Sequence, residues 1–366
     1  MKAWRGLGLL FLGLGSAACG LLLGIPDAIR DDSVGQEAGK GDVLNPDGPA
    51  QDTGGKDTGD QDTGMMMDGA ADGGKVPVPL TSNNRPWGLA IDDMFLFWSE
   101  PTNWVIGRCK KDGSNAVQLA TGSTYAIQVR VIAADGAHVY WAQFDKIYKC
   151  ARGGCGNAPT AIVTGLANSA YTVGLDSTYV YFVEAVPKTL YRVPKSGGSE
   201  QLLATLTADA NSMLVDNGFV IATLQDGSVV KVPVGGGSPV VLTAVTGKDA
   251  RGLTITNARA YYTVLADPAT IGYTPLASPQ GTTPVALMQR LPFGITNDIT
   301  DLYWTETVTL GPSGNVKKCS LANCGQPIVV ASMQNVPKWV VSDTAAIYWT
   351  NFGNGNNEGE LMKLLK

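Results

Sequence analysis

The same cysteine motif occurs twice in the sequence, as KCARGGCG at residues 149–156 and as KCSLANCG at residues 318–325. Each stretch places two cysteines in a Cys-x4-Cys spacing, so that Cys150, Cys155, Cys319 and Cys324 form two equal pairs. Four thiolates together could hold a zinc ion, and one close pair could cycle between thiol and disulfide. Zinc knuckles and redox centres both favour the shorter Cys-x2-Cys spacing. The third alternative is a structural disulfide within each pair, and the surrounding chain must decide among the three.

An aromatic motif typical of a β-strand recurs along the chain. Its occurrences are MFLFWSE (94–100), HVYWAQ (138–143), YVYFVE (179–184), FVIATL (219–224), AYYTVL (260–265), DLYWTE (301–306) and AIYWTN (346–351). We take one residue of each motif as its phase marker, so that the repeats can be aligned. Successive markers lie 39 to 45 residues apart, and they are Trp98, Trp141, Phe182, Ile221, Tyr262, Trp304 and Trp349. A period in this range indicates a modular repeat architecture with seven units.

Each repeat contains the pattern of four short strands. An apolar strand precedes the aromatic motif, and two further strands rich in Val, Tyr and Thr follow it across Gly-rich turns. No stretch shows a long amphipathic helical period. The pattern predicts an all-β fold, a seven-bladed β-propeller of four-stranded antiparallel blades. The last repeat ends one strand short, and VPVPLT (76–81) precedes the first repeat, so we expect this N-terminal strand to close the last blade.

The repeat phase decides among the three roles for the cysteines. Both pairs occupy the hairpin between the third and fourth strands, one in the second repeat and one in the sixth. Outer strands of such distant blades cannot bring four cysteines together, so we predict a disulfide within each pair. Cys109 holds the same place in the first repeat, where Ser114 stands at the partner position. We therefore expect Cys109 to be a free thiol.

The first residues, MKAWRGLGLLFLGLGSAACG, have the layout of an export signal. Two positive charges precede an apolar run, and small residues follow it. Since Cys19 comes next, residues 1–18 resemble a bacterial lipoprotein signal, which implies a lipid-modified Cys19 as the mature N-terminus. Plain secretion after ordinary cleavage and an uncleaved membrane anchor over residues 6–25 are the alternatives. All three export the domain.

Residues 19–75 are predicted to be a disordered acidic linker behind the lipidated cysteine. Residues 27–75 hold 12 acidic and 4 basic side chains and no aromatic residue, so they cannot bury enough apolar surface to fold. Residues 76–366 form the predicted propeller and carry a net charge of +1. This balance gives no basic surface for nucleic acid, so we expect no nucleic-acid partner.

The aromatic motifs FWSE, YWTE and YWTN resemble the repeats of YWTD-type propellers, and more widely those of exported bacterial propellers of the NHL and TolB-like kind. The resemblance covers nearly all of residues 76–366. It implies an architecture that presents loops at the two mouths of a central channel. It does not imply a particular ligand.

The candidate ligand-binding residues lie in the loops that follow the aromatic strands. They are Glu100, Glu184, Glu306, Trp104 and Phe352. The carboxylates could form a ring for cations or polar ligands, or they could hydrogen-bond the loops to their neighbours. Because His138 is the only histidine, we predict no catalytic residue, no multi-histidine metal site and no cofactor.

These observations favour a binding or scaffold module that is tethered to the membrane at the cell envelope and engages a protein or surface polymer. Without lipidation at Cys19 the same module would be secreted. The alternative is a propeller enzyme, a lyase or hydrolase, with a polar or metal site in the central channel.

Overall fold

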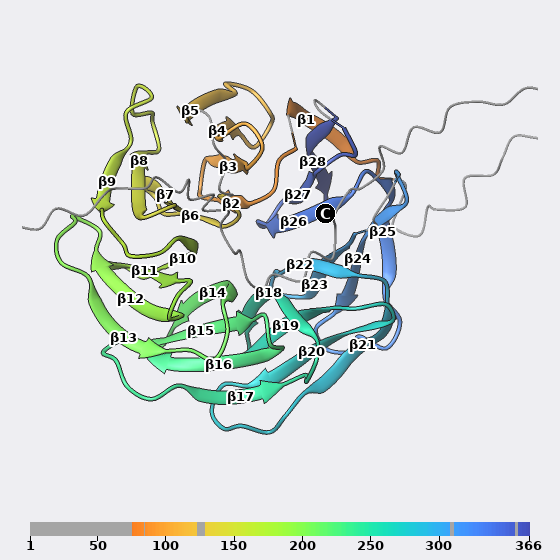
Figure 1. The fold of residues 1–366 in the computed structure, drawn as a ribbon. Coiled ribbons are helices and arrows are strands. Elements are labelled where there is room, and N and C mark those ends of the chain that lie inside the picture. The colour runs from red at the N-terminus through yellow and green to blue at the C-terminus, as the bar shows by residue number, and fades with distance from the viewer. Residues whose placement is uncertain (1–74, 84, 123–128, 308–310, 356–357) are drawn as a thin grey trace, which may run out of the picture. The chain divides into compact units, whose positions relative to one another are not determined.

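The computed structural model describes residues 75–83, 85–122, 129–307, 311–355 and 358–366. These residues form seven antiparallel sheets of four strands each, and Figure 1 shows the sheets as sectors around a common centre. The seven-bladed β-propeller is therefore confirmed. The export signal 1–18, Cys19 and the acidic linker up to residue 74 lie outside the described residues. No helix long and apolar enough to cross a membrane occurs in the described part of the chain.

The strands follow one another in blade order, from the innermost strand of each blade outward. Blade one contains β2 (Leu89–Ile91), β3 (Phe95–Glu100), β4 (Val105–Lys110) and β5 (Val117–Thr121). Blade two contains β6 (Ile132–Ala134), β7 (His138–Gln143), β8 (Lys146–Ala151) and β9 (Thr160–Val163). Blade three contains β10 (Ala170–Leu175), β11 (Tyr179–Glu184), β12 (Thr189–Pro194) and β13 (Gln201–Thr205). Blade four contains β14 (Ala210–Asp216), β15 (Phe219–Leu224), β16 (Ser228–Pro233) and β17 (Val240–Ala244).

The remaining blades include the closing strand. Blade five contains β18 (Asp249–Thr256), β19 (Arg259–Leu265), β20 (Ala269–Pro275) and β21 (Thr283–Gln289). Blade six contains β22 (Pro292–Asn297), β23 (Asp301–Glu306), β24 (Gly314–Ser320) and β25 (Ile328–Gln334). Blade seven contains β26 (Pro337–Ser342), β27 (Ala346–Asn351), β28 (Gly359–Leu365) and, outermost, β1 (Val78–Asn83).

The ring closes through β1, as the sequence predicts. It pairs antiparallel with β28, from Val78 opposite Lys363 to Asn83 opposite Gly359. The innermost strands contact their neighbours all the way around, and β2 contacts β26. Closure covers the edges that an open arc of blades would leave.

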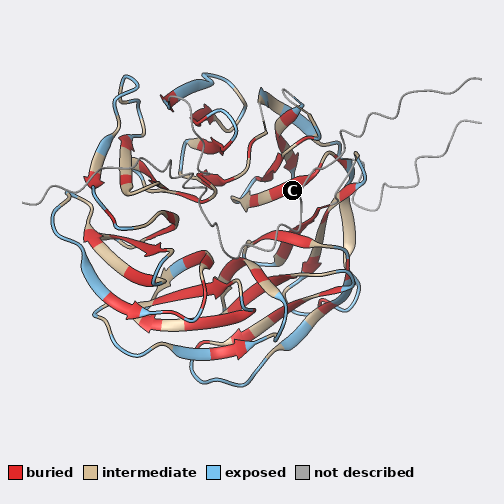
Figure 2. Cartoon of the chain, viewed as in Figure 1, coloured by how far each residue is buried: buried red, intermediate tan, exposed pale blue. Residues whose placement is uncertain are grey.

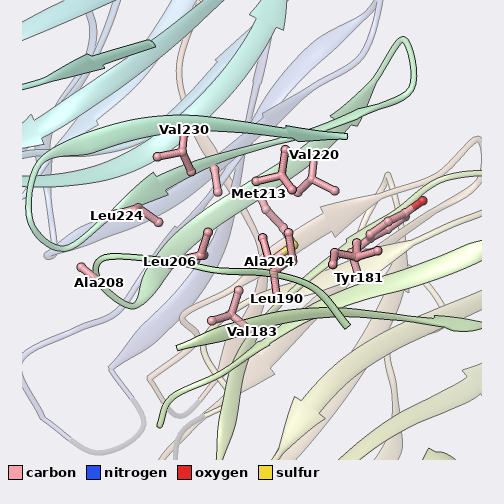
Figure 3. Packing of buried hydrophobic residues seen from close by; sticks show 14 residues of the cluster. Tyr181, Val183, Leu190, Ala204, Leu206, Ala208, Met213, Val220, Leu224 and Val230 are labelled. Carbon is pink, nitrogen blue, oxygen red and sulfur yellow. The ribbon is translucent and has the colours of Figure 1, made fainter. Parts of the chain in front are cut away.

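The cores lie between the blades, one at each of the seven blade interfaces. Successive side chains of a strand point to opposite faces, so β11 buries Tyr181 against blade four and Phe182 against blade two. Figure 2 shows that burial concentrates on the inner strands. Figure 3 shows the packing between blades three and four, where Met213 and Leu190 meet. Burial on both faces explains why the aromatic motifs are apolar almost throughout.

One phase marker is wrong by a residue. The marker is the fourth residue of the second strand in six blades, for example Phe182 in β11 and Trp304 in β23. The fourth residue of β15 is Ala222, which pairs with Met213 on the inner strand. Ile221 is the larger apolar residue, but the hydrogen-bond register makes Ala222 the equivalent of the other markers.

Aspartate turns join the first and second strands on one face of the propeller, which we call the clamp face. In blade two, Asp135 accepts hydrogen bonds from the backbone N–H groups of Ala137 and His138 and from the Tyr140 hydroxyl. Lys195 of blade three donates to the same carboxylate at 2.7 Å. Equivalent lysine bridges between neighbouring blades join Lys366 to Asp298 at 2.7 Å and Lys111 to Asp343 at 3.0 Å. These bridges link neighbouring blades in addition to the apolar cores.

Candidate functional site

The first strands of the blades place seven side chains at one level around the axis. In every blade, the fourth residue of the second strand pairs with one residue of the first strand. The position described here lies two residues before that first-strand partner. The seven are Trp87, Arg130, Tyr171, Asn211, Arg251, Phe293 and Lys338. They lie beside the loops between second and third strands, on the face opposite the clamp face. We call this the axial face.

Contacts between blades that are not neighbours show that these side chains converge. Trp87 of blade one meets Phe293 of blade six edge to face, with ring centroids 5.5 Å apart. Lys338 of blade seven places its ammonium 5.2 Å from the Trp87 ring and 4.8 Å from the Phe293 ring. Phe352 packs edge-on against Trp87 at 5.2 Å, and Arg85 lies 4.2 Å over the Phe352 ring. The axial cluster comprises Arg85, Trp87, Arg130, Arg251, Phe293, Lys338 and Phe352.

Buried hydroxyl groups hold the axial backbone in place. Thr305 accepts a hydrogen bond from the N–H of Gly294 at 3.0 Å in its own blade and donates to the carbonyl of Lys338 at 2.6 Å. Thr350 donates to the carbonyl of Trp87 at 2.9 Å in the same way. The same bridge to the next blade recurs at Thr223 and Thr263. In blades four to seven, the threonine after the fourth residue of the second strand therefore holds the backbone of the axial residue in the following blade.

Glycine next to an axial residue lets neighbouring inner strands approach closely. A Cβ at Gly294 would lie 2.6 Å from the Lys338 carbonyl oxygen, and one at Gly252 would lie 2.6 Å from that of Phe293. At Gly88 the distance to the Arg130 carbonyl oxygen would be 2.3 Å. These distances are below any real Cβ contact, so glycine is required for this packing.

Lys338 is the most deeply buried cation of the cluster. Its side chain is 1% exposed, and its ammonium donates to the Thr307 hydroxyl at 3.1 Å. Burial, together with the positive charges of Arg251, Arg85 and Arg130, lowers the pKa of Lys338 to about 7. Burial and the neighbouring charges therefore bring the pKa of this lysine close to neutral pH.

Asp249 brings a carboxylate to the axial cluster. Asp249 pairs with the Arg251 guanidinium and accepts a hydrogen bond from the Asn211 amide at 2.6 Å. Burial raises the pKa of Asp249, although Arg251 opposes that effect. Burial and the charge of Arg251 lower the pKa of Arg130. The Nε–H groups of Arg85 and Arg251 are buried and have no hydrogen-bond partner among the described residues.

The three predicted carboxylates are buried and accept hydrogen bonds from nearby donors. Glu100, Glu184 and Glu306 are 2–6% exposed. Glu100 accepts from the Trp98 indole at 2.9 Å, and Glu184 accepts from the Asn168 N–H at 2.6 Å. Glu306 accepts from the Lys317 ammonium at 2.9 Å and the Arg290 N–H at 3.0 Å. These contacts tie the loops of each blade together, and direct ligand binding by the three glutamates stays a prediction.

The two predicted aromatic residues lie in different surroundings. Phe352 belongs to the axial cluster. Trp104 is buried and stacks on Phe144 of the next blade, with centroids 5.0 Å apart. Of the five candidate residues, Phe352 contacts the axial cations Arg85 and Lys338.

The cysteine pairing is confirmed. Disulfides join Cys150 to Cys155 and Cys319 to Cys324, with Cα atoms 5.5 and 4.9 Å apart. The second cysteines lie in the connection between the third and fourth strands, since β9 and β25 begin later. Cys109 is a buried free thiol, as expected, and burial raises its pKa to about 12.

His138 begins β7 on the clamp face, where its ring lies 5.9 Å from that of Tyr140. It lines a surface hollow of about 590 Å³ together with Lys149 and with Lys195, the lysine that bridges to Asp135. Within the described ranges, no three His, Cys, Asp or Glu side chains gather so as to hold a metal ion.

The axial cations were missed at the level of sequence. The sequence does contain a signal for these residues. In PWGLAID, RGLTIT and PFGIT the axial residue directly precedes the glycine of the first strand, and Lys338 holds the same position in PKWVVSD. Aligning the repeats at this column collects the axial residues. Their contacts across the ring follow only from closure of the propeller.

Comparison with known proteins identifies the fold and no family. Neither a protein-family model nor a curated protein matches the chain at a significant level. The structure of U3-55K superposes with a TM-score of 0.64 and 10% identity, covering 81% of this chain and 99% of that chain. The chain is a β-propeller. The WD40 propeller domain of Doa1 gives 0.59 and 11% identity over 78% of this chain and 94% of that one. The computationally designed Ika8 protein gives 0.53 and 12% over 79% and 99%. At these identities the likeness extends to the propeller fold alone.

Proposed function

We propose that this propeller is an exported binding module, anchored at the cell envelope through a lipid on Cys19, which engages a protein or surface polymer with its axial face. The export-type N-terminus, the cysteine after it and the acidic linker support the location. The motifs FWSE, YWTE and YWTN support a YWTD-like type of propeller. Without lipidation, the same module acts as a secreted protein.

The axial cluster is the observation that carries the binding function. It gathers four cations and three aromatic rings from five blades at one face, and Arg85, Trp87, Arg130, Arg251 and Phe352 are partly exposed. Arginine and aromatic side chains are enriched where proteins bind partners. The axial cluster therefore provides the recognition surface that we propose.

The strand β1 runs from the clamp face toward the axial face. β1 begins at Val78 opposite Lys363, and Lys363 contacts Lys111 on the clamp face. It ends at Asn83, two residues before Arg85. The chain thus enters the propeller at the clamp face and reaches the axial face only at the end of β1.

The enzyme alternative has less support from the site. A lyase or hydrolase built on Glu100, Glu184 or Glu306 needs carboxylates that reach substrate, and these three are buried and hydrogen-bonded. Loss of an activity in their Gln variants, or stoichiometric metal in the purified protein, would favour the enzyme.

The test is crosslinking and affinity capture from envelope membranes with the full chain and Cys19 intact. A double Arg85→Gln, Arg130→Gln variant tests the axial face, and Arg259→Gln removes a charge from the clamp face. We expect a partner that the wild type and Arg259→Gln enrich and the double variant loses. Equal capture by all three proteins would reject the axial face as the binding surface. Cys19→Ala should release the chain from the membrane fraction, and unchanged membrane association would contradict lipidation.

A further inference from the structure

The closing strand β1 is less buried than the outermost strand of any other blade. None of its residues is buried, whereas the outermost strands of the other six blades each contain two buried residues. Its pairing with β28 is interrupted between Pro79 and Thr81, and Pro79 has no backbone N–H to donate. Elements with few buried apolar contacts open locally at a lower free energy than the rest of a fold. We therefore expect β1 to open before the other strands.

Leu80 provides the contact of β1 with an apolar core. Its side chain is partly buried against the core between blades seven and one, which includes Tyr348 and Leu361. The Leu80 backbone also lies against Gly113 of blade one, where a Cβ would come within 2.7 Å of the Leu80 carbonyl oxygen. Removing the Leu80 side chain should therefore release the strand.

The chain passes from β1 directly into the axial cluster. Arg85 lies two residues after the end of β1, and its guanidinium is 4.2 Å from the Phe352 ring centroid. Its φ of 60° lies in the left-handed region, which a residue other than glycine rarely adopts unless the surrounding structure imposes it. Pro86 is buried at the start of β28, where a Cβ at Gly359 would lie 2.2 Å from its Cδ. Pairing of β1 with β28 thus helps to fix the position of Arg85.

Trp87 is attached independently of β1. Its N–H donates to the Ser99 carbonyl at 2.8 Å, and its carbonyl accepts from the Thr350 hydroxyl at 2.9 Å. Release of β1 would therefore free Arg85 and leave Trp87 in place. Phe352 would lose the cation over its ring and keep its edge contact with Trp87 at 5.2 Å.

We propose that β1 is a latch for the axial face: paired with β28 it holds Arg85 on Phe352, and its release from the folded propeller removes Arg85 from the axial cluster. The consequence for binding rests on the proposed function, because a partner that contacts Arg85 binds the latched state. By linkage, such a partner also holds β1 on β28. The binding face is thus regulated at the strand that closes the ring.

Amide hydrogen exchange of the full chain, read by mass spectrometry, tests the latch without any ligand. We expect the slowest amide of residues 80–83 to exchange roughly tenfold or more faster than the slowest amide of β5, the outermost strand of blade one. Leu80→Asp should also speed exchange of the Phe352 amide, which donates to the Val336 carbonyl at 3.0 Å. Leu202→Asp, at an exposed position in the outermost strand of blade three, is the matched control.

A disulfide lock distinguishes opening of the latch from general unfolding. Ser82 and Glu360 are directly opposite each other in β1 and β28, so cysteines at both positions can form a disulfide. The Ser82→Cys, Glu360→Cys variant should slow exchange in β1. Combined with Leu80→Asp, it should return the Phe352 amide to the wild-type rate until the disulfide is reduced. Thermal unfolding of each variant confirms that it is folded.

Two results would overturn the latch: β1 amides as slow as those of β5, or an unchanged Phe352 amide in Leu80→Asp although β1 exchanges faster. Capture from envelope membranes tests the binding function separately. We expect Leu80→Asp to lose the partner that the locked chain enriches. Equal capture by both variants, with exchange as expected, would reject the axial face as the binding surface and leave the latch in place.

Discussion

The Thr305 hydroxyl donates a hydrogen bond to the Lys338 carbonyl over 2.6 Å, which joins the second strand of blade six to the first strand of blade seven. The same hydroxyl accepts the N–H of Gly294 in its own blade. One buried side chain thus connects the sequence motif YWTE to the position of the axial lysine.

Thr305→Val should destabilise the propeller. Valine keeps the size of the side chain but leaves the Gly294 N–H and the Lys338 carbonyl without their partner in a buried site. We expect a loss of about 1–3 kcal/mol in the free energy of unfolding, measured with urea. Thr305→Ser retains the hydroxyl and serves as the control. A valine variant as stable as the serine variant would show that the bridge contributes nothing.

Gly294→Ala should disturb the axial cluster through sterics alone. The new methyl group would lie 2.6 Å from the Lys338 carbonyl oxygen and 2.9 Å from the Trp339 Cα, both backbone atoms. We expect a loss of about 1–3 kcal/mol in unfolding free energy. Gly136→Ala is the matched control, because nothing lies within 4 Å of a Cβ there. Equal stability of the two variants would contradict the close approach.

Lys338→Met should change how stability depends on pH. Folding lowers the pKa of Lys338 to about 7, so between that value and about 10.5 the unfolded chain binds a proton that the folded chain lacks. The stability of the wild type therefore rises with pH across this window relative to the Lys338→Met variant, by about 1.4 kcal/mol per pH unit. Below pH 7 the buried charge is present in full, and the variant should have its largest advantage there. Urea unfolding at pH 6 and pH 9 measures the difference, and a constant difference would refute the buried cation.

Asp135→Asn tests the interblade bridges at acid pH. Burial by itself raises the pKa of Asp135, but the bond from Lys195 and the backbone N–H groups of Ala137 and His138 outweigh it and hold the pKa at about 2. The stabilisation is present above the unfolded pKa near 4 and disappears as pH falls toward 2. We expect the asparagine variant to be less stable at pH 7 and equal to the wild type near pH 2. Asp216→Asn, at the corresponding turn of blade four, is the control. A deficit that persists at pH 2 would mean that charge is not the cause.

Cys109 should resist alkylation in the folded protein. Burial and the nearby Asp112 raise the pKa of its thiol to about 12, so the reactive thiolate is scarce at neutral pH. Mass mapping without reduction should show alkylation of Cys109 only after unfolding, with Cys150–Cys155 and Cys319–Cys324 intact. A Cys109–Cys150 or Cys155–Cys319 bridge in that map would contradict the pairing.

The sequence by itself determined the repeat, the strand order within each blade, the closing strand and both disulfides. These features depend on local spacing: the aromatic markers recur in each repeat, and a Cys-x4-Cys pair closes within one hairpin. Even here the register of β15 needed the structure, since side-chain size favours Ile221 whereas hydrogen bonding selects Ala222.

Only the tertiary structure decided where the candidate site lies. Glu100, Glu184 and Glu306 look available in the sequence, but local donors bind all three carboxylates in the fold. Trp87, Arg130 and Lys338 belong to separate repeats, and no local pattern brings them together. Their convergence comes from ring closure, which places one residue per blade at the same level of the axis, where charges from distant parts of the chain act on one another over short distances.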